Sequence, residues 1–198
     1  MTSPAPRAWR VVARDTVADC RVFRVQKLHS IREAAPDEAV GRRLESDFFC
    51  LDSKDFVNVV ALTDDDEVIL VEQYRHGTAE MTLEVPGGLV DAGEDPIAAG
   101  LRELVEETGY GGGRAEILGV CRPNPAIQSN RLTTILVRGA HPVATTAFDE
   151  HEECAVHVLP FAEVISRLDS GVIDHALVVV ALSYELRRRA QLAGAGAA

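Results

Sequence analysis

The segment 88–110 reads GLVDAGEDPIAAGLRELVEETGY, and its second half gathers negative charge. Glu103, Glu106 and Glu107 fall within five consecutive residues. On a helix, residues three and four positions apart are neighbours, so like charges at this spacing repel one another. The segment is therefore either an ordinary solvated acidic face or a place where a strongly positive group binds.

The pattern around these glutamates predicts a helix. Asp95 is a suitable N-cap, Pro96 fits the first helical position, and Gly109 stands where a C-terminal glycine belongs. An apolar stripe at helical spacing is formed by Ile97, Leu101, Leu104 and Val105. At about 100° per residue the glutamates lie on the far side from that stripe. Helix geometry alone leaves both metal ligation and simple solvation open.

The remaining pattern predicts a mixed α+β domain built mostly from antiparallel strands. Strands are expected over 9–15, 20–31, 44–51, 56–63, 67–75, 81–85, 115–122, 131–139 and 154–160, and further helices over 160–171 and 175–192. The strands 56–63 and 67–75 flank an acidic turn and are expected to form a hairpin.

Composition limits the classes of function. The chain of 198 residues fits one domain with an appended subdomain. Its net charge is −11 and it lacks a basic patch, so we expect no nucleic-acid partner. The one basic cluster, Arg187–Arg189, is expected to be a favourable charge at the end of the last helix. No apolar run could span a bilayer and no secretory signal is evident, so no membrane partner is expected. Four scattered cysteines indicate reduced thiols and a cytoplasmic location.

The segment resembles the Nudix box, whose pattern is G-x5-E-x7-R-E-U-x-E-E-x-G-U, where U is a bulky apolar residue. The matching positions are Gly88, Glu94, Arg102, Glu103, Leu104, Glu106, Glu107 and Gly109. Tyr110 occupies the last position, where an aliphatic residue is usual. So many matches at fixed spacing are far more specific than a lone glycine-rich loop. The resemblance implies a Nudix fold, a mixed β-sheet sandwiched by helices, with an N-terminal β-strand subdomain.

The resemblance also implies roles for the box residues. The expected ligands of Mg²⁺, or of Mn²⁺ in its place, are Glu103, Glu107, Glu106 and the backbone carbonyl of Gly87. These are the oxygen ligands that a hard divalent cation prefers. Arg102 is expected to orient the glutamates through charge-assisted hydrogen bonds, with Glu94 supporting it. Glu106 and Arg102 are thus candidates for the catalytic set, although a plain helix ion pair is the alternative for Arg102.

Sequence outside the box is similar to the branch of this family that cleaves ADP-ribose and other nucleotide sugars. The similarity rests on VEQYRHGT (71–78) and LEVPGGLVDAGE (83–94), and on Pro125, fifteen residues after Tyr110. Arg75, Glu84 and Pro125 are therefore expected to bind substrate, Arg75 through the phosphates, whose geometry a guanidinium matches. The alternatives are a surface arginine at a strand end and an ordinary proline loop.

A late acidic loop, DEHEE (149–153), aligns with the loop that closes over the site in this branch. The resemblance implies that Glu150 is the general base and Glu152 a further metal ligand. The alternative is an acidic surface loop.

The expected organisation has four parts. Residues 1–7 are expected to be disordered, 8–51 to form an N-terminal β subdomain that dimerises, 52–192 to form the Nudix domain, and 193–198 to be a disordered tail. In the resembling branch the first segment is often exchanged between subunits, so a homodimer is expected.

The activity implied is Mg²⁺-dependent hydrolysis of the diphosphate in a nucleoside diphosphate sugar, with ADP-ribose giving AMP and ribose 5-phosphate as the leading case. GDP-mannose or another sugar nucleotide is the alternative substrate. A non-catalytic Nudix ligand sensor ranks lower, because such domains typically lose box glutamates that this chain keeps.

Overall fold

The computed structural model describes residues 5–33, 43–147 and 153–195. The chain divides into two compact units. The first contains residues 1–54 together with 124–130, and the second contains 55–123 and 131–198. The first unit therefore ends slightly later than the expected subdomain at 8–51, and it gains a segment from the middle of the chain.

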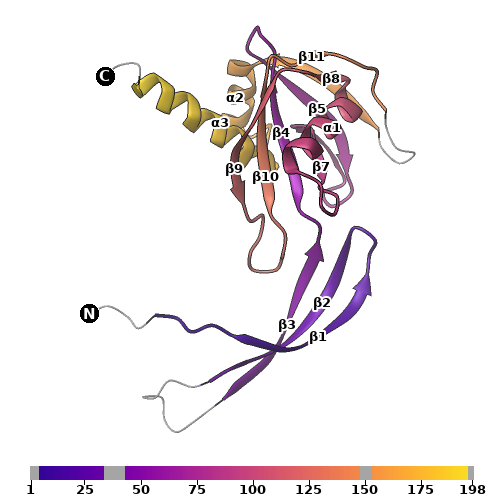
Figure 1. The fold of residues 1–198 in the computed structure, drawn as a ribbon, viewed down its shortest axis with the longest axis vertical. Coiled ribbons are helices and arrows are strands. Elements are labelled where there is room, and N and C mark those ends of the chain that lie inside the picture. Colours follow the sequence, from indigo (N-terminus) through magenta and orange to yellow (C-terminus); the bar gives the residue numbers. More distant parts are fainter. Residues whose placement is uncertain (1–4, 34–42, 148–152, 196–198) are drawn as a thin grey trace. The chain divides into compact units, whose positions relative to one another are not determined.

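The first unit is an antiparallel meander in the order β1-β2-β3 (Figure 1). Its strands are β1 (Arg10–Asp19), β2 (Phe23–Arg32) and β3 (Leu44–Ser53). Every residue of β1 is exposed. The segment 124–130 joins this unit through β3, where the Leu51 amide donates to the Ile127 carbonyl at 2.7 Å.

The second unit holds the remaining elements. Its strands are β4 (Phe56–Leu62), β5 (Glu67–Arg75), β6 (Glu80–Glu84), β7 (Gly87–Leu89), β8 (Tyr110–Gly111), β9 (Arg114–Cys121), β10 (Leu132–Arg138), β11 (His141–Pro142) and β12 (Cys154–Pro160), and its helices are α1 (Pro96–Thr108), α2 (Phe161–Asp169) and α3 (Ala176–Ala195). The main sheet has the order β12-β5-β4-β10-β9, with β6 paired to β5 and β7 paired to β4. Strand β10 runs parallel to β4, whereas its pairing with β9 is antiparallel, so the sheet is mixed.

Alternation along the central strand β4 builds the three layers, because successive side chains of a strand point to opposite faces. Val57 and Val59 pack with Ala99 and Leu104 of α1 on one face. Val60 packs with the apolar residues of α2 and α3 on the other face. The expected sheet between helices is confirmed, with α1 on one side and α2 and α3 on the other (Figure 1).

Helix α3 differs from the sequence prediction in its length. It continues to Ala195, three residues into the stretch expected to be a tail. Arg187–Arg189 therefore lie well before the helix end, and their predicted role as C-terminal helix charges is wrong. Within the described ranges, no helix is both long enough and apolar enough to cross a membrane.

Candidate active site

The box helix α1 begins and ends as its sequence predicts. The Asp95 carboxylate accepts hydrogen bonds from the amides of Ile97 at 2.9 Å and Ala98 at 3.2 Å, and Pro96 is the first helical residue. Gly109 ends the helix with a φ of 72°, in the left-handed region that glycine adopts without steric cost. The helix is therefore fixed at both ends by local sequence.

Gly100 brings α1 unusually near the sheet, and the sequence analysis did not single it out. A Cβ atom at this position would lie 2.6 Å from Cδ1 of Ile135 and 3.1 Å from side-chain atoms of Val57 and Val59. A side chain there would push the helix away from β4 and β10. A glycine inside an otherwise helical pattern is the signal that could have indicated this close approach.

Two box glutamates meet the backbone of β7. The amide of Gly87 donates to Oε2 of Glu107 at 2.9 Å, and Glu107 is only 8% exposed. A Cβ atom on Gly88 would lie within 2.7 Å of all three carboxylate atoms of Glu103. A side chain at residue 88 would therefore collide with the Glu103 carboxylate, and a Cβ atom at residue 87 would lie 2.2 Å from the Val57 carbonyl oxygen, so both positions require glycine. Strand β7 in turn pairs with Val57 and its neighbours in the central strand β4.

Arg102 ties the acidic residues together. Its Nε and Nη2 donate to the two oxygens of Glu94 at 3.1 and 3.2 Å, and Nη2 also donates to the Leu89 carbonyl at 3.2 Å. Its Nη1 donates to Glu103 at 2.9 Å and to Glu106 at 3.0 Å. These contacts, with Glu94 foremost, raise the pKa of Arg102, and the arginine with the Asp91 amide lowers the pKa of Glu94. We call Glu94, Arg102, Glu103 and Glu106 the box cluster.

The donor set of this region fits a hard divalent cation in its chemistry. Glu103 and Glu107 are four residues apart on one helix face and offer carboxylate oxygens, the ligands that Mg²⁺ and Mn²⁺ prefer. Within residues 5–33, 43–147 and 153–195, no three acidic, histidine or cysteine side chains converge closely enough to hold a metal by themselves. A cation here would therefore also need backbone carbonyls, waters or substrate oxygens, as Mg²⁺ sites commonly do.

The two expected substrate residues of the sheet bind each other. Arg75, at the end of β5, donates through Nε and Nη2 to the two oxygens of Glu84 at 2.6 and 2.7 Å. Thr82 donates to the same carboxylate at 2.5 Å. Burial would raise the pKa of Glu84, but the contacts of its carboxylate with Arg75, His175 and Thr82 lower it to about 2. The pair is therefore ionised at neutral pH.

The other predicted site residues fall elsewhere. Pro125 belongs to the segment 124–130 of the first unit. Glu150 and Glu152 lie outside the described residues. The structure thus brings together the box residues, and pairs Arg75 with Glu84, within the second unit.

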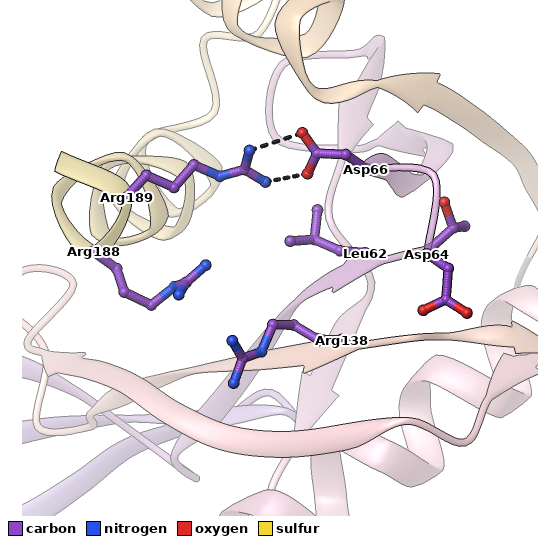
Figure 2. Close-up of a pocket in the computed structure, with 7 residues that line it drawn as sticks. Leu62, Asp64, Asp66, Arg138, Arg188 and Arg189 are labelled. Carbon is purple, nitrogen blue, oxygen red and sulfur yellow. Dashed lines mark hydrogen bonds and ion pairs between the residues drawn. The ribbon is translucent and has the colours of Figure 1, made fainter. Parts of the chain in front are cut away.

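A cavity of about 360 Å³ lies elsewhere in the second unit, and none of the predicted site residues lines it (Figure 2). Its lining comprises Leu62, Thr63, Asp64, Asp66, Arg138, Arg188 and Arg189. Arg189 donates to both oxygens of Asp66, and its guanidinium lies 3.6 Å from the centre of the Phe161 ring. Arg188 and Arg189 also donate to the fully buried Glu185 at 2.7 Å.

We call Asp66, Glu185, Arg188 and Arg189 the α3 cluster. Arg138, which also lines the cavity, forms an ion pair with Glu116 at 3.2 Å. Each arginine of the cavity is therefore matched by a carboxylate. The cluster links α3 to the turn between β4 and β5, which is a structural role.

Comparison with known proteins identifies the family of this chain. The NUDIX domain family matches residues 53–181. The chain is 30% identical to a methanol dehydrogenase activator from Bacillus methanolicus over 65% of this chain and 70% of that protein. It is 35% identical to an ADP-sugar pyrophosphatase from Mus musculus over 59% of this chain and 56% of that protein. The chain thus spans little more than half the length of the mouse relative.

A solved structure described as an ADP compounds hydrolase superposes with a TM-score of 0.76 at 26% sequence identity. The match covers 98% of this chain and 99% of that one, so it includes the N-terminal unit as well as the sheet with its helices. With the family match spanning most of the chain, and with Glu103 and Glu107 lying against β7, the chain belongs to the Nudix hydrolase family.

Proposed function

We propose that this protein hydrolyses the diphosphate linkage of a nucleoside diphosphate sugar, with ADP-ribose as the first candidate and AMP and ribose 5-phosphate as products. One observation carries the proposal: Glu103 and Glu107 of α1 both lie against the Gly87–Gly88 backbone, where Arg102 holds Glu103. Relatives named ADP-sugar pyrophosphatase and ADP-ribose pyrophosphatase support the choice of substrate.

Mg²⁺ is the proposed cofactor, with Mn²⁺ as a substitute, and Glu103, Glu106 and Glu107 are the side chains that would hold it. Bound there, a divalent cation would neutralise diphosphate charge and lower the pKa of a water molecule. The Gly87 carbonyl is a proposed additional ligand, and Glu152 is proposed to contribute from the late loop. Oxygen ligands and open positions for water suit either ion.

The residues of the chain have distinct proposed tasks. Arg102 keeps Glu103 and Glu106 in position through its Nη1 atom. Arg75 is proposed to bind a phosphate oxygen of the substrate, since its Nε and Nη2 donate to Glu84 and its Nη1 donates to no acceptor among the described residues. Pro125 is proposed to contact the substrate and Glu150 to accept the proton of the attacking water. The rate gain then comes from positioning and charge stabilisation.

The assembly and location belong to the same proposal. The exposed apolar residues of β1, among them Val11, Val12 and Val17, suit burial by a second copy of the chain in a homodimer. A strand edge is also open to pairing with another chain. All four cysteines are free, which suits the cytoplasm. No nucleic-acid or membrane partner is proposed.

The substrate test is a panel of ADP-ribose, GDP-mannose, UDP-glucose, ADP-glucose and dinucleoside polyphosphates with Mg²⁺, followed by phosphatase release of phosphate. ADP-ribose is expected to give the highest kcat/KM, and a preference for GDP-mannose would establish the alternative substrate. An absence of turnover across the panel would contradict the proposed activity and would favour a ligand sensor.

The metal assignment is tested with Glu107→Gln. We expect kcat to fall by roughly a hundredfold or more, because metal-assisted charge stabilisation contributes several kcal/mol. Glu163→Gln is the matched control, since Glu163 pairs with Arg167 on the surface of α2. Near-wild-type activity of Glu107→Gln would remove Glu107 from the metal site.

A further inference from the structure

Glu84 is a buried carboxylate that receives contacts from three different elements. It is 3% exposed and ends β6. Arg75 approaches it from β5 and Thr82 from β6 itself. His175 approaches from the residue before α3, with its Nδ1 atom 3.1 Å from Oε2 of Glu84. None of the expected roles of the site residues accounts for this histidine.

His175 is held in place by its own backbone. Its carbonyl accepts the amides of Val178 at 2.9 Å and Val179 at 3.0 Å, which are first-turn hydrogen bonds of α3. Two residues further along the chain, the Leu177 carbonyl accepts a hydrogen bond from Asn58 of β4 at 3.2 Å. The start of α3 is therefore attached to the sheet, which keeps the backbone of His175 beside Glu84.

The Nδ1 atom of His175 depends on Glu84 for a polar partner. It is shielded from solvent, and among the described residues it makes no hydrogen bond of good geometry. The carboxylate oxygen at 3.1 Å is within hydrogen-bond distance, so a small rotation of the ring would align the two atoms. A shielded polar atom without a partner is costly, which favours this contact.

The orientation of Arg75 follows from that of Glu84. Two parallel hydrogen bonds between a guanidinium and a carboxylate place both groups in one plane. Any rotation of the Glu84 carboxylate would therefore tilt the guanidinium and move its Nη1 atom. The hydrogen bonds to Glu84 are the main cause of the raised pKa of Arg75, and the negative charge of Glu107 on the box helix adds to it.

We propose that His175 is a positioning residue that acts through Glu84 to fix the guanidinium of Arg75 for a phosphate group of the substrate. The proposal rests on the proposed function, in which Arg75 binds the diphosphate. His175 touches neither the reacting atoms nor the substrate in this scheme. Its removal should therefore weaken substrate binding while the chemical step proceeds as before.

The kinetic test compares His175→Ala with His175→Asn, whose amide nitrogen can replace Nδ1 as a donor to Glu84. With ADP-ribose and Mg²⁺, we expect KM to rise about fivefold in His175→Ala with kcat within twofold of wild type, the effect of losing roughly one hydrogen bond. His175→Asn should restore most of the KM. An unchanged KM in His175→Ala, or a fall in kcat alone, would overturn the proposal.

His157→Ala is the matched control. Its imidazole also lies 3.1 Å from a carboxylate, that of Glu72, and is 39% exposed against 36% for His175. Glu72 is 41% exposed, whereas Glu84 is 4% exposed and bound by an arginine. His157→Ala should leave KM and kcat at wild-type values, which separates the specific effect from the general loss of a histidine.

A double-mutant cycle tests the route through Arg75. Arg75→Lys keeps a positive charge beside Glu84 but removes the bidentate geometry. In this background His175→Ala should change KM by less than twofold, because the guanidinium that His175 positions through Glu84 is no longer present. A fivefold rise in both backgrounds would show that His175 acts independently of Arg75, which would contradict the proposal.

An NMR measurement that needs no substrate turnover tests the positioning role of His175 independently of the proposed hydrolase activity. In the ¹⁵N spectrum of the full chain, the Arg75 Nε–H resonance, assigned by its loss in Arg75→Lys, should shift or broaden in His175→Ala and remain in His175→Asn. If the protein hydrolyses no substrate of the panel, the proposed function fails and this spectrum still decides the positioning. An identical Arg75 signal in His175→Ala would overturn it.

Discussion

The box cluster and the α3 cluster are both built from arginines and carboxylates, yet they balance charge differently. In the box cluster one guanidinium contacts three carboxylates. In the α3 cluster two guanidiniums contact two carboxylates, one of them fully buried. The first arrangement leaves an excess of negative charge where a cation can bind, whereas the second is complete by itself.

The ratio of arginines to carboxylates therefore distinguishes a cation-binding site from a cluster that only stabilises the fold. RELVEE (102–107) and YELRRR (184–189) look alike as charged helical segments. In the second, Arg188 and Arg189 reach back to Glu185 at i+3 and i+4, and Arg189 also binds Asp66. Substitutions in the box cluster should therefore reduce activity, whereas substitutions in the α3 cluster should reduce stability.

The largest stability effect is expected for Glu185→Gln. It leaves Arg188 without its carboxylate in a buried setting, and breaking such a pair costs about 3–5 kcal/mol of unfolding free energy. Urea denaturation measures the loss, and kcat with the best substrate of the panel should stay within twofold of wild type. Glu163→Gln, at an exposed ion pair, should cost less than about 1 kcal/mol. Equal stability of the two variants would remove the distinction between the clusters.

A somewhat smaller effect is expected from the acid titration of Glu84, an arginine-bound carboxylate that lies outside both clusters. Because its pKa in the folded protein is about 2, its contribution to stability is complete above its ordinary value of 4.5 and is lost as the pH falls between these values. The contribution is on the order of 3 kcal/mol, from about 1.4 kcal/mol per pKa unit.

The difference in unfolding free energy between wild type and Glu84→Gln should accordingly shrink from pH 6 to pH 3, because Glu84 becomes protonated. Other carboxylates titrate in both proteins, so their effect cancels in this difference. Urea denaturation at several pH values measures it. A difference that stayed constant over this range would show that Glu84 is not held ionised by its contacts.

The smallest expected effect is the gain in folding stability when Mg²⁺ binds, which should depend on the box helix and not on the α3 cluster. Mg²⁺ at a hundred times its dissociation constant should stabilise the folded state by about 2.7 kcal/mol. This gain, measured as a rise in Tm against a sample with EDTA, should vanish in Glu107→Gln and persist in Glu185→Gln. A Tm that rose equally in all three proteins would place the cation outside the box.

The sequence predicts most of what depends on local chemistry. The Asp95 cap and the Gly109 end of α1 follow from spacing within one helix, and both are confirmed. The contact of Glu103 and Glu107 with Gly88 and Gly87 depends on the pairing of β7 with β4, which no local pattern specifies.

Long-range packing explains what the sequence analysis missed. Most strand pairs are antiparallel, as predicted, but the parallel pairing of β10 with β4 joins segments more than seventy residues apart, and no local pattern indicates it. His175 meets Glu84 only because α3 packs across the sheet, and their separation in the chain hides the contact. Residues 187–189 were assigned to a helix end because the small, weakly apolar tail gave no reason to extend α3.

The pairing of β7 with β4 has a consequence for how the enzyme would respond to heat. Many binding segments are loops that loosen before the rest of the fold. Here Gly87 and Gly88 are strand residues hydrogen-bonded to the central strand, and their neighbours Val57 and Val59 are fully buried. The backbone beside the glutamates can therefore loosen only if β7 leaves the central strand, which would expose Val57 and Val59, so we expect thermal inactivation and global unfolding at the same temperature.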